Sequence, residues 1–121
     1  MALSSKVNGS GINHLTLAAL CLDVSNGLTA TGTNQATDFA MTAADNEFTT
    51  VTSGTGAILF AGVAGDEQWV YNGGANPLTV YPDVGSKING LPINTGVIIP
   101  INTSCSFKKM SSTRWAGMLS R

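Results

Sequence analysis

Residues that usually carry catalysis are few in this chain. It contains one histidine, His14, and two cysteines, Cys21 and Cys105. A Cys–His or Ser–His–Asp site would need this single histidine as its base. Nothing in the sequence brings either cysteine near His14, and the Gly-x-Ser-x-Gly turn of a serine hydrolase is absent. We therefore expect His14 to be structural or exposed and both thiols to be free and buried.

Acidic residues are the next candidates for chemistry. Asp45 and Glu47 flank Asn46, and Asp66 precedes Glu67, so either pair could hold a surface Ca²⁺ through oxygen ligands. The spacing matches neither an EF-hand loop nor a zinc motif, and no two acids are marked out as a glycosidase pair. We expect solvated turns at these positions, with no metal and no other cofactor.

Four aromatic residues could stack on a sugar: Trp69, Tyr71, Tyr81 and Trp115. Core packing is the commoner fate of tryptophan in a small β-domain, so both interpretations stay open at this point. The glycine-rich stretch at 53–57 is not followed by the Gly-Lys-Ser/Thr of a phosphate loop and predicts a hairpin turn. The residues therefore predict a protein that is not an enzyme.

Composition indicates what kind of scaffold would position these side chains. Of the 121 residues, 43% are hydrophobic and only 11% are charged, whereas about 25% are charged in an average globular protein. Gly, Ser, Thr and Asn together supply 49 residues. Disorder normally needs low hydrophobicity and high net charge, so this profile instead suits a β-protein with many turns. Its low charge suits a surface that is covered by something other than water.

Short strands separated by turns are predicted along most of the chain. Runs rich in β-branched and aromatic residues alternate with Gly- and Asn-containing clusters, which lie at 8–11, 25–27, 53–56, 64–67, 72–74, 88–90 and 94–96. This spacing predicts an all-β fold, a compact β-sandwich or jelly-roll-like barrel of short antiparallel strands with an N-terminal arm. Proline cannot donate to a sheet ladder, so we expect a strand start, edge or corner at each of Pro77, Pro82, Pro92 and Pro100.

Alternation within the runs predicts which side chains face inward. Cys105 and Phe107 share one side of their strand, and Leu78 and Val80 share one side of theirs. In the run at 67–72, Trp69 and Tyr71 lie on the side opposite Gln68 and Val70.

Two parts of the chain are predicted from length and pattern. Residues 27–121 form one β-sandwich domain, because a chain of this length has the size of a single domain. Residues 1–26 form an N-terminal arm, either extended or a short helix, which contains Leu15, Leu17, Leu20 and Leu22. We expect these leucines to be covered by a neighbouring molecule; the alternative is that they form a first strand of the same domain.

Charge and hydropathy exclude two classes of partner. The formal net charge is −1, and nucleic-acid binding demands a basic patch that six dispersed cations do not supply. No apolar run approaches the ~18 residues of a membrane span, and no secretory signal is visible. We expect synthesis in a cytoplasm and no contact with nucleic acid or membrane.

One long segment resembles a known family. The run at 71–119 is similar to a segment that recurs in small tailed-phage virion proteins, and the run at 27–60 resembles the preceding part of the same domain. In that pattern an Asn-Gly-rich turn leads into a strand that ends in Val-Tyr-Pro, followed by Ile-Asn-Gly and a closing Phe strand and Trp. The matching residues are Asn72, Gly74, Ala75, Asn76, Val80, Tyr81, Pro82, Gly85, Ile88, Asn89, Gly90, Asn94, Phe107, Thr113 and Trp115.

The resemblance implies a component of a phage particle more firmly than it implies a position on that particle. It implies a capsid decoration (cement) protein that binds the outer surface of the major capsid protein lattice, stabilises it, and is made in the cytoplasm of a bacterial host. A homo-oligomer matched to local three-fold positions is expected, a trimer in preference to a dimer. Leu15, Leu17, Leu20 and Leu22 would then contact the capsid or another subunit. The alternative is a carbohydrate- or receptor-binding β-module of a phage fibre or other host-adhesion protein.

Overall fold

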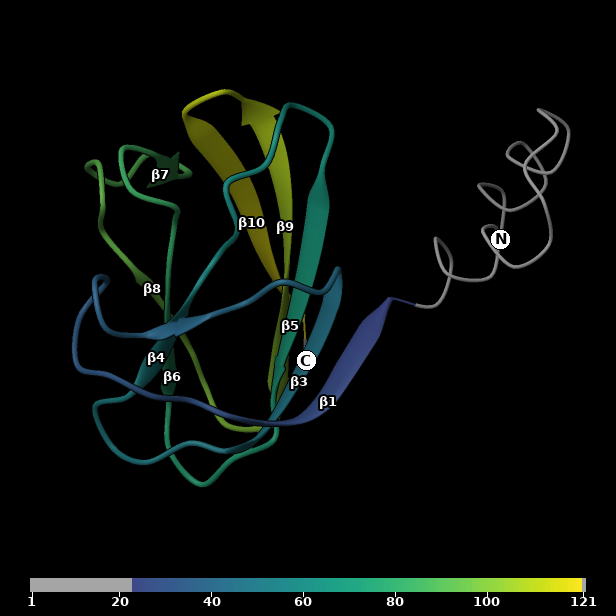
Figure 1. Cartoon of the computed structure of the whole chain (residues 1–121), viewed down its shortest axis with the longest axis vertical. Helices are drawn as coiled ribbons and strands as arrows, with labels where there is room; N and C mark the ends of the chain where they lie inside the picture. The colour runs from purple at the N-terminus through teal and green to yellow at the C-terminus, as the bar shows by residue number, and fades with distance from the viewer. Residues whose placement is uncertain (1–22, 121) are drawn as a thin grey trace, which may run out of the picture.

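The computed structural model describes residues 23–120, and all regular elements in this part of the chain are β-strands (Figure 1). The predicted all-β class is therefore confirmed. The strands are β1 Val24–Thr29, β2 Phe39–Ala40, β3 Asp45–Thr50, β4 Gly56–Ile58, β5 Glu67–Asn72, β6 Leu78–Tyr81, β7 Lys87–Ile88, β8 Val97–Ile99, β9 Thr103–Ser111 and β10 Arg114–Ser120.

The first six strands form three coils of a β-solenoid. The chain passes from one sheet to the other with each successive strand, so β1, β3 and β5 lie parallel in one sheet and β2, β4 and β6 lie parallel in the second. Val24 pairs with Asp45 on the next coil, and Asp45 pairs in turn with Trp69. Residues one coil apart therefore stack on one another.

The last four strands close the stack with a different geometry. Strand β9 pairs antiparallel with β5, β10 pairs antiparallel with β9, and β8 pairs antiparallel with β6. Strand β7 joins β10 over a short parallel contact. The result is a six-stranded sheet in the order β1-β3-β5-β9-β10-β7 facing a four-stranded sheet in the order β2-β4-β6-β8 (Figure 1).

The expected sandwich or jelly-roll-like barrel of antiparallel strands is wrong for the coils. Side chains alternate with a period of two in parallel and antiparallel strands alike, so alternation carries no information about strand direction. The glycine-rich stretch at 53–57 illustrates the error, because it connects β3 of one sheet to β4 of the other. It is a corner between sheets and not a hairpin turn.

The core lies between the two sheets. Phe48, Val70 and Phe107 of the six-stranded sheet and Leu78 and Val80 of the four-stranded sheet are each at most 1% exposed. These positions confirm the inward side predicted for β6 and β9, and they show that in β5 the side of Gln68 and Val70 faces inward. The expectation for proline is confirmed at three of the four positions. Pro77 and Pro82 flank β6, Pro100 follows β8, and Pro92 lies between β7 and β8.

Buried amides support the corners where the chain changes sheet. The Asn72 side chain is fully buried and its Nδ2 donates to the carbonyls of Asn76 and Ile99 at 2.9 and 3.0 Å. Asn76 in turn donates to the Val51 carbonyl on the preceding coil at 2.9 Å. Because backbone groups at such corners have no ladder partner, these amides supply the hydrogen bonds that burial requires.

Part of the predicted N-terminal arm lies outside the described residues. This holds for Leu15, Leu17, Leu20 and Leu22 and also for His14 and Cys21. The predicted boundary between residues 26 and 27 falls inside strand β1, which begins at Val24.

Candidate functional site

A hollow of about 500 Å³ lies on the outer face of the six-stranded sheet. Across the sheet, Asp45 lies beside Trp69, Trp69 lies opposite Ser106, and Ser106 lies opposite Met118. The short side chains of Ser106 and Ala116 stand among longer ones, which leaves an open space above them. We call this the Trp69 hollow; the side chains that define it are Asp23, Asp45, Glu67, Trp69, Ser106, Lys108, Met110, Ala116 and Met118.

Trp69 presents one face of its indole to the hollow. On its other face it stacks with Tyr71, with ring centroids 6.1 Å apart and an angle of 12° between the ring planes. Tyr71 lies two residues further along the same strand and does not line the hollow. The neighbouring ring holds the indole upright on the sheet, so its free face is preorganised for a flat partner.

The charges around the hollow are unbalanced. Lys108 Nζ lies 3.9 Å from Glu67 Oε1, and because both side chains are more than half exposed this ion pair contributes little stability. Asp23 Oδ2 accepts a hydrogen bond from the Ala44 backbone N–H at 3.0 Å. Within residues 23–120, neither Asp23 nor Asp45 forms a salt bridge. Three carboxylates therefore face one ammonium group, a formal excess of two negative charges.

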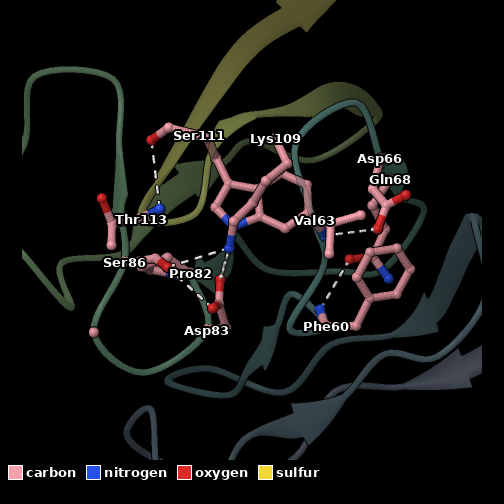
Figure 2. Close-up of polar contacts among 12 residues, drawn as sticks. Phe60, Val63, Asp66, Gln68, Pro82, Asp83, Ser86, Lys109, Ser111 and Thr113 are labelled. Atoms are coloured by element: carbon pink, nitrogen blue, oxygen red, sulfur yellow. Dashed lines mark hydrogen bonds and ion pairs between the residues drawn. The ribbon is translucent and has the colours of Figure 1, made fainter.

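The opposite face of the same sheet contains a buried ion pair (Figure 2). Lys109 Nζ lies 2.9 Å from Asp83 Oδ1 and donates to Ser86 Oγ at 3.3 Å. Trp115 Nε1 donates to the same Asp83 oxygen at 2.8 Å, and the lysine nitrogen lies 4.9 Å from the centre of the Trp115 ring. We call these four residues the Lys109 cluster.

Local structure brings the Lys109 cluster together. Lys109 and Trp115 come from paired strands β9 and β10 and point into the core, where Trp115 is fully buried and Lys109 is 1% exposed. Asp83 and Ser86 come from the turn that follows β6, in which Ser86 Oγ also hydrogen-bonds Asp83 Oδ2 at 3.0 Å. Strand β7 follows this turn directly and pairs with β10, which places the turn beside Trp115.

The environment of Asp83 keeps this carboxyl ionised. Burial by itself would raise the pKa of Asp83, but hydrogen bonds from Trp115, Lys109 and Ser86 outweigh it and hold the pKa below its ordinary value. The charge of Lys109 acts in the same direction. The pair is thus a carboxylate with an ammonium ion, which is the arrangement that tolerates burial.

The Lys109 cluster is suited to holding structure and not to catalysis. A lysine that attacks a substrate must lose its proton and reach the substrate. The carboxylate of Asp83 and the face of Trp115 both attract a positive charge. The Lys109 side chain is also completely shielded from solvent. The ion pair links the β9–β10 hairpin to the turn after β6, and we assign it that role.

The residues that the sequence singled out do not converge. Trp69 and Tyr71 lie on the outer face of the six-stranded sheet, Tyr81 ends β6 in the four-stranded sheet, and Trp115 is in the core. The four aromatic residues therefore do not form one sugar platform. Cys105 is free and buried, as expected, and burial raises the pKa of its thiol to about 11.

The acidic pairs are also placed differently from the expectation. Asp45 and Glu47 lie in strand β3, and Glu67 begins strand β5, so these three residues are not in turns. Only Asp66 lies in a turn, where its Oδ2 accepts a hydrogen bond from the Val63 N–H at 2.9 Å. Among residues 23–120, no group of three or more His, Cys, Asp or Glu side chains converges as metal ligands would.

The sequence alone predicted neither the Trp69 hollow nor the Lys109 cluster, although strand alternation gave an indication of the second. Lys109 has the same parity in its strand as Cys105 and Phe107, so extending the alternation by two residues would have indicated an inward lysine. Its partner Asp83 lies 26 residues away, and no local pattern relates the two. The Trp69 hollow depends on which residues lie side by side on four strands, and only the register of the folded sheet shows that.

The comparisons with known proteins add no relative. No model of a protein family matches the chain, and neither does any curated protein. In the part of the chain that the structure describes, there is no helix with the length and apolar character needed to cross a membrane.

Proposed function

We propose that this protein is a structural interaction protein of a phage particle, a capsid decoration (cement) protein that binds the outer surface of the major capsid protein lattice and stabilises it. It acts without catalysis and without a cofactor. The observation that carries the proposal is the contrast between a closely packed apolar core and an outer sheet face that presents large apolar side chains. On this face Met118, which lies across Ser106 from Trp69, is 73% exposed, and Met110 of β9 is 48% exposed.

Such a face has the composition of a protein-binding surface. Tryptophan, tyrosine and methionine are enriched where proteins bind each other, and large aromatic side chains supply most of the binding energy. A strand-built face is also rigid, so little conformational entropy is lost when a partner covers it. On a repeating lattice, many such contacts of modest strength add up through avidity.

The resemblance to small tailed-phage virion proteins supports the same proposal through its structural residues. Asn72 and Asn76 support a corner of the coils, and Asn89 exchanges two hydrogen bonds with the Gly117 backbone at 3.0 and 3.3 Å. Asn89 and Asn94 have positive φ angles of 52° and 64°, which asparagine tolerates better than most residues. The shared pattern thus describes a rigid scaffold that holds a surface.

We further propose that the protein forms a homotrimer through a second surface. A smaller groove of about 230 Å³ opens where β8 and β10 are the outer strands, and it is flanked by Ile98 and Leu119, which are 61% and 50% exposed. Strand β10 pairs with β7 only at Arg114 and Trp115, and the Asn89 side chain occupies both backbone groups of Gly117. Only beyond Gly117 does the edge of β10 that faces away from β9 have no strand partner among the described residues. An apolar groove beside an open strand edge suits a second copy of the chain.

Sedimentation and capsid binding test these two proposals separately. Analytical ultracentrifugation at micromolar concentration should show a trimer, and a stable monomer or dimer would contradict the trimer alone. Purified protein added to capsids that lack it should cosediment with them and raise the temperature at which they open. Capsids that neither bind the protein nor gain stability would contradict the decoration function.

The N-terminal arm provides a further test of how the protein attaches. We propose that Leu15, Leu17, Leu20 and Leu22 contact the capsid or a neighbouring subunit. Deletion of residues 1–22 should leave a folded β-domain, because every described strand lies beyond residue 22, but capsid attachment should weaken severely. A truncated protein that fails to fold would show instead that these leucines belong to the core.

The second candidate function is a carbohydrate- or receptor-binding module of a phage fibre or other host-adhesion protein. The observation in its favour is the free face of Trp69 beside carboxylates, which could stack on a sugar ring and accept hydrogen bonds from its hydroxyls. A glycan array separates the two candidates. A decoration protein should bind capsids and no glycan, whereas an adhesion module should bind a defined glycan and no capsid.

A further inference from the structure

The chemistry of the Trp69 hollow selects the kind of group that it can bind. Asp45 and Trp69 are paired neighbours on adjacent parallel strands, so a carboxylate stands beside the aromatic ring. A carboxylate and an aromatic face both attract a cation, and a planar guanidinium can satisfy the two together. Asp23 adds a second carboxylate on the same side of the hollow.

Other classes of ligand fit the hollow less well. An anion such as phosphate would meet three carboxylates against one ammonium group. A metal ion would need convergent ligands, and no such group forms among residues 23–120. A neutral sugar could stack on Trp69, but it would leave the excess negative charge without a counterpart.

The apolar rim indicates that the cation belongs to a protein. Met118 lies across Ser106 from Trp69, and Met110 lies on β9 two residues beyond Lys108; they are 73% and 48% exposed. A small cation such as a free polyamine would leave these methionines uncovered. A side chain at the surface of a protein carries apolar neighbours with it, and the flexible methionines can pack against them.

We propose that the Trp69 hollow binds an arginine side chain that a protein partner presents between apolar residues. The guanidinium stacks on the free face of Trp69 and pairs with Asp45, while the flanking apolar side chains cover Met110 and Met118. This inference goes beyond the proposed function, because it identifies the chemistry of the contact whatever the partner is. Arginine is preferred to lysine, since only its planar group can stack and form two parallel hydrogen bonds.

A peptide titration tests this inference without a capsid. The probe is acetyl-Leu-Arg-Leu-amide, and its matched control is acetyl-Leu-citrulline-Leu-amide, which has nearly the same shape and no charge. The indole N–H signal of Trp69 is followed by ¹H–¹⁵N NMR at low salt, with the buried Trp115 as internal reference. The arginine peptide should shift the Trp69 signal saturably and leave Trp115 in place, with at least a tenfold weaker effect for the citrulline peptide.

Two variants on strand β3 make the test specific. Asp45→Asn should weaken binding of the arginine peptide about tenfold. Glu47→Gln removes an acid from the same face of the same strand but outside the hollow, and it should change binding less than twofold. Equal binding of the two peptides, unchanged binding in Asp45→Asn, or no shift at 10 mM peptide would overturn the inference. A neutral oligosaccharide that displaces the arginine peptide would also overturn it, in favour of a sugar site.

Capsid cosedimentation distinguishes this failure from failure of the proposed function. If the peptide does not bind but the protein still cosediments with capsids, the arginine site is wrong and the decoration function stands. If the peptide binds but capsids do not, the hollow has a cationic partner elsewhere.

Discussion

Two adjacent lysines show how differently the two faces of the six-stranded sheet use the same residue type. Lys108 points outward, is more than half exposed, and lies 3.9 Å from Glu67 in a solvated ion pair. Lys109 points inward, is shielded from solvent, and is fixed by Asp83, Ser86 and Trp115. The two tryptophans divide in the same way, since Trp69 stands on the outer face and Trp115 is fully buried.

This comparison shows on which face of the sheet a charged side chain can bind a ligand. Inside, desolvation favours polar groups that have partners, so Lys109 is held by its neighbours and cannot bind a ligand. Outside, water screens the charges and leaves the same residue types free to bind. The inner face therefore supplies stability, and under our proposal the outer face binds the partner.

The largest difference in stability is expected between variants of the two tryptophans. Trp115→Ala should lower the free energy of unfolding by about 5 kcal/mol, because it leaves a large cavity and removes a hydrogen bond to Asp83. Trp69→Ala should lower it by less than about 1 kcal/mol. Urea unfolding at one fixed protein concentration, followed by far-UV circular dichroism, measures both. Trp115→Phe should fall between them, and similar losses for Trp69→Ala and Trp115→Ala would remove the contrast.

The next largest difference in stability is expected between variants of the two lysines. Lys109→Met should destabilise the fold by about 3 to 5 kcal/mol, because it leaves the Asp83 carboxylate buried without its cation. Lys108→Met is the matched control on the same strand, and it should change stability by no more than about 0.5 kcal/mol. Combining Lys109→Met with Asp83→Asn should recover part of the loss. Equal effects of the two lysine substitutions would show that the ion pair of Lys109 does not stabilise the fold.

A smaller effect comes from the buried thiol at high pH. Burial raises the pKa of Cys105 from 9.0 to about 11, so the unfolded chain releases this proton first as the pH rises. The stability is then complete below about pH 9 and is lost toward pH 11, by roughly 2 to 3 kcal/mol at ~1.4 kcal/mol per pH unit. Wild type and Cys105→Ala should be compared by urea unfolding at pH 8 and pH 10.5. A constant difference between them would contradict the prediction.

The smallest effect is expected in acid. The pKa of Asp83 is lowered in the folded protein, so its contribution is present above the unfolded value of about 3.9 and is lost as the pH falls below it. Asp38 acts in the opposite sense, because burial raises its pKa more than its hydrogen bond with the Asn34 backbone lowers it. The stability advantage of wild type over Lys109→Met/Asp83→Asn should therefore shrink between pH 5 and pH 2. An advantage that grows in acid would exclude an ionised Asp83.

Part of this fold was predictable from local pattern. Alternation placed Leu78 with Val80, and Cys105 with Phe107, on the inward side of their strands, because each strand has one face on the core. In the run at 67–72 alternation separated Trp69 from Val70 but did not show which of the two faces the core. Pro77, Pro82 and Pro100 correctly marked strand ends. These predictions succeed because they depend only on residues that are neighbours in the chain.

What the sequence could not predict depends on residues that are far apart in the chain. The direction of a strand leaves no trace in its own alternation, so the coils were mistaken for antiparallel pairs. The pairing of Lys109 with Asp83 requires the turn after β6 to meet strand β9, and the Trp69 hollow requires four strands to lie in one register. Cys105 was predictable as a buried thiol, whereas a surface hollow was not.

The coil geometry has a consequence for how this molecule can change in evolution. Each coil contacts mainly the coils next to it, and the β9–β10 hairpin closes only the last of them. Insertion of one whole coil would keep every residue on its own sheet and lengthen the stack by about 4.8 Å, the spacing between paired strands. Insertion of half a coil would exchange the two sheets and bury the wrong side chains. Proteins that evolve from this fold should therefore differ in length by whole coils, while the β9–β10 hairpin at the end of the stack stays the same.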